Sequence, residues 1–259
     1  MSYCILYKDN IDYYNLKNTF KNKIKDDYDE NNPDAVIAVG GDGTIIRAVH
    51  TYPNALIFGL NAGHLGYYCK YSLKDLELLI NDINNKSYMI EKIPLLKTKV
   101  YKDNKAIIDE ISINESVILS PLKTLQLEVR IDDYILESFK GNGLCFSTSY
   151  GSTGFNRSLN GAIVDRELNV IQMTEIAGIN STAYKSLSSP LVIGGSRRIS
   201  LKPMYDANVY ASVDNIPYEL SSFDEMCIRY DGSYVRIAYH IEEGFIKRLN
   251  RAFINELES

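Results

Sequence analysis

The pattern of apolar positions changes about one third of the way along the chain. In the first part, continuous apolar runs alternate with segments whose apolar residues recur every three or four positions. The continuous runs are typical of buried parallel strands, and the periodic segments of amphipathic helices. The predicted strands are residues 3–7, 35–39 and 55–60, and the predicted helices are residues 9–29, a short one after 44, and 72–84. Strand and helix in alternation predict a right-handed α/β unit with a parallel sheet.

From residue 89 to about 241 the pattern becomes one of short strands separated by turn residues. Residues 125–131 and 134–139 alternate with period two around Asp132 and Asp133, which predicts a hairpin. Further predicted strands are residues 97–101, 106–119, 170–176, 199–203, 209–213, 226–230 and 234–239. This series predicts an all-β domain of sandwich type.

The last segment, residues 243–258, returns to helical spacing and is predicted to pack on the first domain. The predicted fold is therefore an open parallel α/β domain followed by a β-rich, sandwich-like domain. The α/β domain comprises residues 1–95 with about 240–259, and the β-rich domain comprises residues 96–239.

Three glycines and one carboxylate stand between the second strand and its helix, as Gly40-Gly41-Asp42-Gly43-Thr44. Glycine lets a backbone approach a phosphate closely, and a helix start offers free N–H groups to an anion. Asp42 would repel a phosphate, so its presence favours a role as proton acceptor for a hydroxyl, or as a metal ligand. The alternative is that Asp42 caps the helix and the glycines form a plain turn.

A second glycine loop, residues 61–68, follows the third strand at the same predicted edge of the sheet. Ligands of open α/β sheets bind at the carboxyl ends of the strands, so two loops there predict a crevice. The alternative is an ordinary strand–helix turn, which Gly and Asn often form.

Two stretches of the β region carry unusual polar residues. Asn114 and Glu115 stand in an apolar strand, where both need a polar partner; the alternative is a strand end or an edge pair. Residues 140–161 combine glycines with hydroxyl side chains. Such a segment offers uncharged donors suited to a neutral base or sugar, and the alternative is a long surface loop.

Composition excludes several classes of protein. The net charge of −5 argues against a nucleic-acid binder, which needs a basic surface. The four cysteines are scattered without zinc spacing, and no apolar run is long enough to span a bilayer. With no signal peptide in the pattern, a cytoplasmic location is expected.

In combination and order, these motifs resemble the NAD kinase family, of the small Gram-positive bacterial type. The matching pieces are residues 40–44, 61–67, 114–115, 151–156, 189–191 and 212–214. Diacylglycerol and sphingosine kinases and 6-phosphofructokinases share only the first piece.

The resemblance implies phosphorylation of NAD by ATP at the 2′-hydroxyl of the adenosine ribose, with Asp42 as general base. The phosphate loop would be Gly40, Gly41, Gly43 and Thr44. The residues implied to bind NAD are Asp42 and Gly43 beside the reacting groups, Asn114 and Glu115 on ribose hydroxyls, Thr153 and Ser158 on adenine with Tyr67 beside it, and also Lys140, Asn142, Gly154, Phe155, Ala177 and Asn215. The resemblance also implies Mg²⁺ or another divalent cation carried by ATP, with no protein metal cage, and a homo-oligomer, as a tetramer.

The chain departs from the family pattern at a few positions. Lys140-Gly141-Asn142 replaces the usual Arg-Gly-Asp, Gly154 and Phe155 replace Ala and Tyr, and a Trp-bearing tail is missing. Lysine lacks the two-pronged fork of arginine, and Asn142 lacks a charge. These departures motivate one alternative, a dinucleotide-binding sensor with weak turnover. A second alternative is a lipid kinase, although the sequence does not predict an amphipathic helix with the basic face that binds a membrane.

Overall fold

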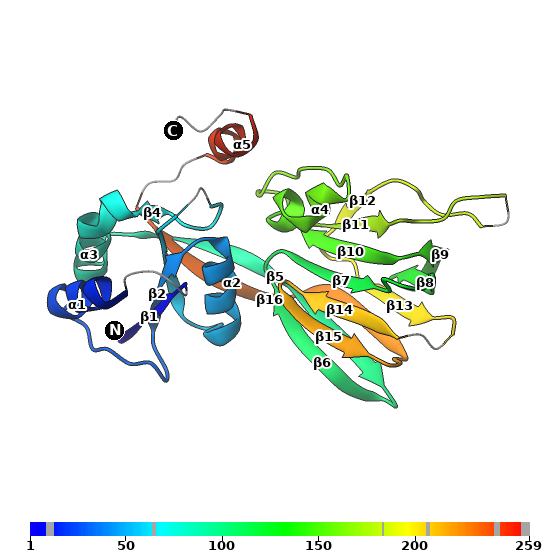
Figure 1. Ribbon diagram of the computed structural model, residues 1–259, viewed down its shortest axis with the longest axis horizontal. Helices are drawn as coiled ribbons and strands as arrows, with labels where there is room; N and C mark the ends of the chain where they lie inside the picture. Colours follow the sequence, from blue (N-terminus) through cyan, green and yellow to red (C-terminus); the bar gives the residue numbers. More distant parts are fainter. Residues whose placement is uncertain (9–12, 64–65, 183, 206–207, 241–243, 255–259) are drawn as a thin grey trace. The chain divides into compact units, whose positions relative to one another are not determined.

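The computed structural model describes residues 1–8, 13–63, 66–182, 184–205, 208–240 and 244–254. The chain forms two compact units, one of Met1–Ile93 with Tyr234–Ser259 and one of Pro94–Ser233. Two long strands, β5 (Met89–Lys102) and β16 (Glu225–Tyr239), each contribute residues to both units. Figure 1 labels the elements along the chain.

The first unit is an α/β unit with a parallel sheet. Its strands follow the order β1 (Tyr3–Tyr7), β2 (Ala35–Gly40), β3 (Leu56–Asn61) and the end of β16, and β4 (Tyr71–Ser72) pairs with the end of β3. Every one of these pairs is parallel. The three predicted apolar strands are therefore confirmed, and β2 is buried along its whole length because helices cover both of its faces.

Helices α1 (Tyr13–Lys23) and α3 (Leu76–Asn85) pack on one face of this sheet, and α2 (Asp42–Thr51) packs on the other (Figure 1). Gly59 makes the second contact possible, because a Cβ there would lie 2.8 Å from Ile45 Cδ1 on α2. The helix predicted at residues 9–29 is shorter than expected. Residues 9–12 lie outside the described residues, and residues 27–29 instead hydrogen-bond alongside Tyr3 at the start of β1.

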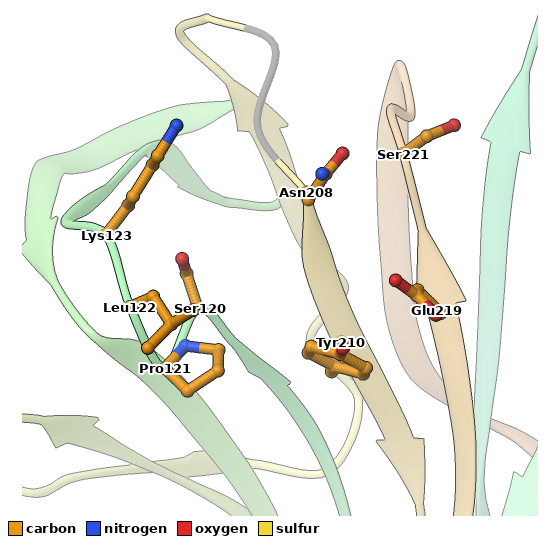
Figure 2. Close-up of a pocket in the computed structure, with 8 residues that line it drawn as sticks. All are labelled: Ser120, Pro121, Leu122, Lys123, Asn208, Tyr210, Glu219 and Ser221. Atoms are coloured by element: carbon orange, nitrogen blue, oxygen red, sulfur yellow. The ribbon is translucent and has the colours of Figure 1, made fainter.

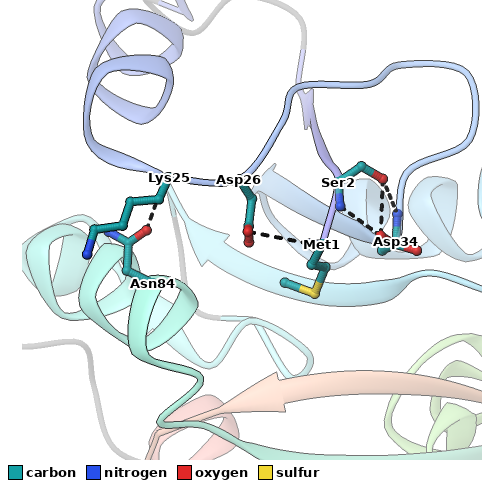
Figure 3. Close-up of polar contacts among 6 residues, drawn as sticks. All are labelled: Met1, Ser2, Lys25, Asp26, Asp34 and Asn84. Atoms are coloured by element: carbon teal, nitrogen blue, oxygen red, sulfur yellow. Dashed lines mark hydrogen bonds and ion pairs between the residues drawn. The ribbon is translucent and has the colours of Figure 1, made fainter.

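A small polar cluster joins the starts of β1 and β2 (Figure 3). The Asp34 carboxylate accepts hydrogen bonds from the Ser2 N–H at 2.7 Å and from the Ser2 hydroxyl at 3.3 Å. The Asp34 N–H in turn donates to Ser2 Oγ at 3.1 Å. These bonds satisfy backbone groups where the two strands begin, and so help to set their register.

The second unit is a β-sandwich, as predicted. One sheet has the order β12 (Leu191–Gly194), β11 (Val170–Ile176), β10 (Gly143–Thr148), β7 (Glu115–Leu119), β14 (Val209–Val213) and β15 (Ile216–Leu220). The other sheet contains β13 (Ile199–Pro203), β8 (Leu125–Ile131) and β9 (Tyr134–Gly141), with β16, β5 and β6 (Lys105–Ser112). Buried residues of both sheets, such as Phe139 and Phe146, share one core.

Two strand predictions were wrong. Residues 106–119 do not form one strand, because the chain breaks between β6 and β7 at Ile113 and Asn114. Residues 226–230 and 234–239 belong to the single strand β16. There Asp231 accepts hydrogen bonds from both Ser233 donors, so the turn-forming residues are satisfied locally and the strand continues.

The last helix of the described chain is α5 (Phe245–Phe253), within the predicted segment 243–258. Residue 243 and residues 255–258 of that segment lie outside the described residues. None of the helices in the described ranges is long and apolar enough to cross a membrane.

Candidate active site

Packing accounts for only one of the three glycines in the loop between β2 and α2. A Cβ on Gly40 would lie 2.2 Å from Thr44 Oγ1, so this position excludes larger residues. A Cβ on Gly41 or Gly43 would contact no atom of the described residues within 4 Å. The described residues therefore leave the start of α2 uncovered on this side, where an anion could approach the free backbone N–H groups of a helix start.

Asp42 is the first residue of α2, and its carboxylate does not cap the helix. Oδ2 accepts a hydrogen bond from the Tyr67 N–H at 2.7 Å, and Oδ1 accepts one from the Tyr68 N–H at 2.9 Å. The alternative of Asp42 as a capping residue is therefore wrong, since Gly41 occupies the cap position. The two predicted glycine loops of the first unit meet at this carboxylate.

Gly66 shapes the same contact. A Cβ on Gly66 would lie 2.6 Å from Asp42 Oδ1, which is closer than such atoms approach in proteins. The absence of a side chain there lets the second loop close onto the carboxylate. His64 and Leu65 of the same motif lie outside the described residues.

Helix α5 contacts this second loop through two residues. Arg248 is buried, at 5% exposure, and its Nη1 donates to the Tyr67 carbonyl. The Phe253 ring lies 6.0 Å from the Tyr67 ring, centroid to centroid, at 33°. The sequence pattern contains no signal for the Arg248 contact, because it joins residues 181 positions apart.

In the second unit, Asp214 holds the turn that carries Asn114 and Glu115. Its Oδ1 accepts from the N–H groups of Asn114 at 2.8 Å and Glu115 at 3.2 Å, and its Oδ2 accepts from Ile113 N–H at 3.0 Å. The Asp214 N–H donates to the Glu115 carbonyl at 2.8 Å. Three donors on one buried carboxylate make this a rigid turn. Sequence reasoning placed residues 212–214 in a motif without predicting this role for Asp214.

Glu115 is the first residue of β7 and is buried, at 7% exposure. Burial, together with the nearby charge of Asp214, raises the pKa of Glu115 to about 8. Within the described chain, its buried Oε2 has no hydrogen-bond partner. Glu115 therefore carries a proton at neutral pH and has donor and acceptor capacity available for a ligand.

The loop that follows β10 packs directly on this turn. A Cβ on Gly151 would lie 2.1 Å from the Asn114 carbonyl oxygen, and one on Gly154 would lie 3.5 Å from Glu115 Oε2. Gly154 and Ser158 line an open cavity of about 610 Å³ that Arg157 and Asn160 also border. The two neighbours of Gly154 in sequence differ in burial. Phe155 is 41% exposed, and Thr153 is half-buried. Asn215 lies beside Asp214 in the turn between β14 and β15.

The structure places Lys140, Asn142 and Ala177 elsewhere. A Cβ on Gly141 would lie 2.9 Å from the Ala177 carbonyl oxygen, so these residues form one group. In the antiparallel pair of β7 and β10, Gly143 is opposite Leu119 and Ser147 is opposite Glu115. Four residues at about 3.3 Å each separate the two ends of β7 by about 13 Å. No single base or ribose can therefore contact both Asn142 and Glu115 of one chain.

Lys140 and Asn142 already have partners within the unit. Lys140 Nζ lies 3.7 Å from the centroid of the Tyr184 ring, and Asn142 Nδ2 donates to the Ser120 carbonyl at 3.0 Å. An aspartate at position 142 could not donate this hydrogen bond, which gives a structural reason for the asparagine.

A further hollow of about 370 Å³ lies in the second unit (Figure 2). Its lining includes Ser120, Lys123, Tyr210 and Glu219, which come from the segment after β7 and from β14 and β15. None of its lining residues belongs to the predicted site, and no sequence motif predicted it.

Comparison with known proteins finds similarity to NAD kinases at the level of both family models and individual relatives. Residues 8–88 match the ATP-NAD kinase N-terminal domain family, and residues 108–234 match the ATP-NAD kinase C-terminal domain family. The chain is 34% identical to an NAD kinase of Lactobacillus gasseri over 90% of this chain and 88% of the relative. It is 36% identical to an NAD kinase of Shouchella clausii over 88% and 89% of the two chains.

Two solved structures share the fold at lower identity. Yeast NADH kinase complexed with NADH has a TM-score of 0.85 and 20% identity, covering 99% of this chain and 89% of that one. An NAD kinase from Archaeoglobus fulgidus in complex with ATP has a TM-score of 0.76 and 21% identity, covering 98% and 97%.

Proposed function

The chain belongs to the ATP-NAD kinase family, and we propose that Asp42 is the general base of its reaction. The protein is an enzyme that uses ATP to phosphorylate NAD, as its family membership and relatives indicate. The proposed acceptor is the 2′-hydroxyl of the adenosine ribose, and the product is NADP. In this step the ribose oxygen forms a bond to the γ-phosphorus of ATP, the bond to the leaving ADP oxygen breaks, and Asp42 accepts the hydroxyl proton.

The observation that carries this proposal is the carboxylate of Asp42 at the start of α2. Two backbone N–H groups orient it, and no side chain of the described residues covers the adjacent backbone of Gly41 and Gly43. Phosphoryl transfer asks the protein mainly for positioning and charge stabilisation, so one oriented proton acceptor beside an anion-binding backbone suffices. The phosphate loop is proposed to be Gly40, Gly41, Gly43 and Thr44.

The proposed NAD contacts fall into two groups. Asn114, Glu115, Thr153 and Ser158 are assigned to the adenosine, and the cavity beside Gly154 and Ser158 supports this. The protonated Glu115 can donate to a ribose oxygen as well as accept from a hydroxyl. Tyr67, Phe155 and Asn215 are further proposed NAD contacts.

The second group, Lys140, Asn142 and Ala177, supports the proposal of a homo-oligomer, with the tetramer as the expected form. These residues lie at the opposite end of β7 and β10 from Glu115. They would contact another part of the dinucleotide, or a dinucleotide held by a second copy of the chain.

A cytoplasmic location stays a prediction from the sequence.

The divalent cation is proposed to arrive with ATP. Among the described residues, no three His, Cys, Asp or Glu side chains are grouped to hold a metal ion. A cation such as Mg²⁺ is commonly held by substrate phosphates with few protein ligands, and when bound it would offset phosphate charge.

We also propose that α5 is part of the first domain in the working enzyme. The contacts of Arg248 and Phe253 with Tyr67 support this arrangement.

The test of the proposed function is NADP formation from NAD, ATP and Mg²⁺, followed with an NADP-specific dehydrogenase. The wild-type protein should turn over, and Asp42→Asn should lower kcat at least about 100-fold, because general-base catalysis contributes that much or more. Calorimetry should show NAD binding to Asp42→Asn close to that of wild type. Retained turnover in Asp42→Asn would reject the base assignment, and a silent wild type that still binds NAD would favour a sensor.

A further inference from the structure

One peptide group lies between the Asp42 carboxylate and a buried cation of the C-terminal helix. The N–H of Tyr68 donates to Asp42 Oδ1 at 2.9 Å. The carbonyl of the same peptide group belongs to Tyr67 and accepts from Arg248 Nη1. Because a trans peptide is planar, its C=O and N–H point in opposite directions. A guanidinium that holds the carbonyl therefore also sets the direction of the N–H toward Asp42.

We infer that Arg248 is a positioning residue for Asp42, acting through the peptide group between Tyr67 and Tyr68. The inference rests on the proposed role of Asp42 as general base. A charged donor on a carbonyl polarises the peptide and strengthens the hydrogen bond that its N–H makes. Arg248 thus orients the base without touching the reacting atoms.

Three further observations fit this role. Arg248 is 5% exposed, so its guanidinium is held in place rather than free in solvent. Phe253, a little more than one turn along the same helix, contacts the Tyr67 ring and holds the same loop. The Cys69 thiol lies near both charges: its pKa is raised to about 12, mainly by burial and then by the charge of Asp42, while Arg248 lowers it.

Lysine is a poor substitute at this position. Its ammonium is a compact, strongly hydrated point charge, whereas guanidinium presents donors in a rigid plane and is more weakly hydrated. Arg248→Lys keeps the positive charge and can still donate to a carbonyl, so it should keep part of the positioning effect on Asp42. Arg248→Met removes both and retains most of the apolar stem.

The experiment compares kcat and KM for NAD in wild type, Arg248→Met, Arg248→Lys and Arg251→Met. Arg251 lies on the same helix and is exposed, so Arg251→Met is the matched control for losing one arginine of α5. Misplacing a catalytic group by about 1 Å can lower a rate by about 100-fold, so Arg248→Met should lower kcat by about 10- to 100-fold. KM for NAD should change less than about threefold, Arg248→Lys should recover part of kcat, and Arg251→Met should resemble wild type.

A double-mutant cycle separates positioning from a general structural role. In the Asp42→Glu background, where the carboxylate is already displaced, Arg248→Met should lower kcat by less than about twofold. An equal loss in both backgrounds would overturn the inference, as would Arg248→Met turnover equal to that of Arg251→Met. If Arg248→Met does not fold, the same comparison is made with Arg248→Lys, where full kcat would overturn the inference.

These outcomes are distinct from failure of the proposed function. A wild type that makes no NADP rejects the kinase assignment. A wild type that turns over, with Asp42→Asn silent and Arg248→Met fully active, rejects only the role of Arg248.

Discussion

Two carboxylates of this protein occupy contrasting surroundings. Asp42, at the start of a helix in the first unit, is half-buried and accepts two backbone hydrogen bonds. Glu115, at the start of a strand in the second unit, is buried with one oxygen unpartnered within the described chain, and its pKa is raised to about 8 by burial and by Asp214.

The contrast teaches that surroundings, rather than residue type, assign the chemistry. A carboxylate held by backbone donors is oriented for one task, here the proposed acceptance of a proton. A buried carboxyl that is protonated at neutral pH suits ligand recognition, because it can donate as well as accept. Asp214 belongs with Asp42 in this respect, since its oxygens are occupied by backbone N–H groups.

The largest expected effect is a loss of kcat in Gly66→Ala, which disturbs the surroundings of Asp42. The new Cβ would lie 2.6 Å from Asp42 Oδ1 and displace the carboxylate from its two donors. A displacement of about 1 Å lowers a rate by about 100-fold, so kcat should fall by about that factor while NAD affinity by calorimetry stays similar. Gly63→Ala is the control, because a Cβ at that exposed position of the same loop meets no atom of the described residues within 4 Å. Equal kcat in the two variants would contradict the geometry at Asp42.

The second effect concerns the protonation of Glu115. Because burial raises its pKa above the ordinary value of 4.5, the folded protein holds a proton that the unfolded chain releases. This contribution to stability is complete below about pH 4.5 and is lost as the pH rises to about 8. Glu115→Gln, which stays neutral, should match wild type at pH 4.5 and be more stable by about 4 kcal/mol at pH 8.5.

Urea unfolding at the two pH values measures this difference in the free energy of unfolding. The exposed Glu167→Gln serves as the control for removing one charge, and its stability difference from wild type should not grow with pH. A constant difference between Glu115→Gln and wild type across the range would show that Glu115 is ionised in the folded protein.

The third effect tests the hydrogen bonds that Asp214 accepts. Asp214→Ala leaves the N–H groups of Ile113, Asn114 and Glu115 without their acceptor, and places alanine at a φ of 52°. Unsatisfied buried donors should lower the free energy of unfolding by about 2 kcal/mol, and KM for NAD should rise with it.

Asp132→Ala is the matched control for Asp214→Ala. Asp132 also begins a hairpin turn at positive φ, of 54°, but it is less buried and accepts from Arg197 and Arg198. Its loss should be smaller, at about 1 kcal/mol or less. An equal loss at both positions would mean that the backbone conformation, and not the triple acceptor, carries the effect.

The smallest effect is expected from Gly154→Ala, which introduces the residue that the family resemblance leads us to expect. The new Cβ would lie 3.5 Å from Glu115 Oε2, an ordinary contact, and 3.3 Å from the Gly151 carbonyl oxygen, which is tight. The free energy of unfolding should change by about 0.5 kcal/mol or less, and NADP formation should stay within about twofold of wild type. A loss of NAD binding would show that the glycine is required for ligand access.

Much of the fold was predictable because hydrophobic periodicity is local. Strands 170–176, 199–203 and 209–213 match the structure residue for residue. The break at Ile113 and Asn114 was missed because a distant aspartate, not a local turn signal, makes it. The edge strands β12 and β15 were also missed, since half-exposed strands carry a weak apolar pattern.

The sequence by itself determined the features that depend on neighbours in the chain. These are the alternation of strands and helices and the presence of the family motifs in their order. Only the tertiary structure decided how each motif residue is used. It brings Asp42 to Tyr67, Asp214 to Asn114 and Arg248 to the Tyr67 carbonyl, across 25, 100 and 181 positions. It also separates Asn142 from Glu115 along one strand pair. Hydrogen bonds, burial and pKa depend on atoms a few ångströms away in space, and the order of residues does not specify those atoms.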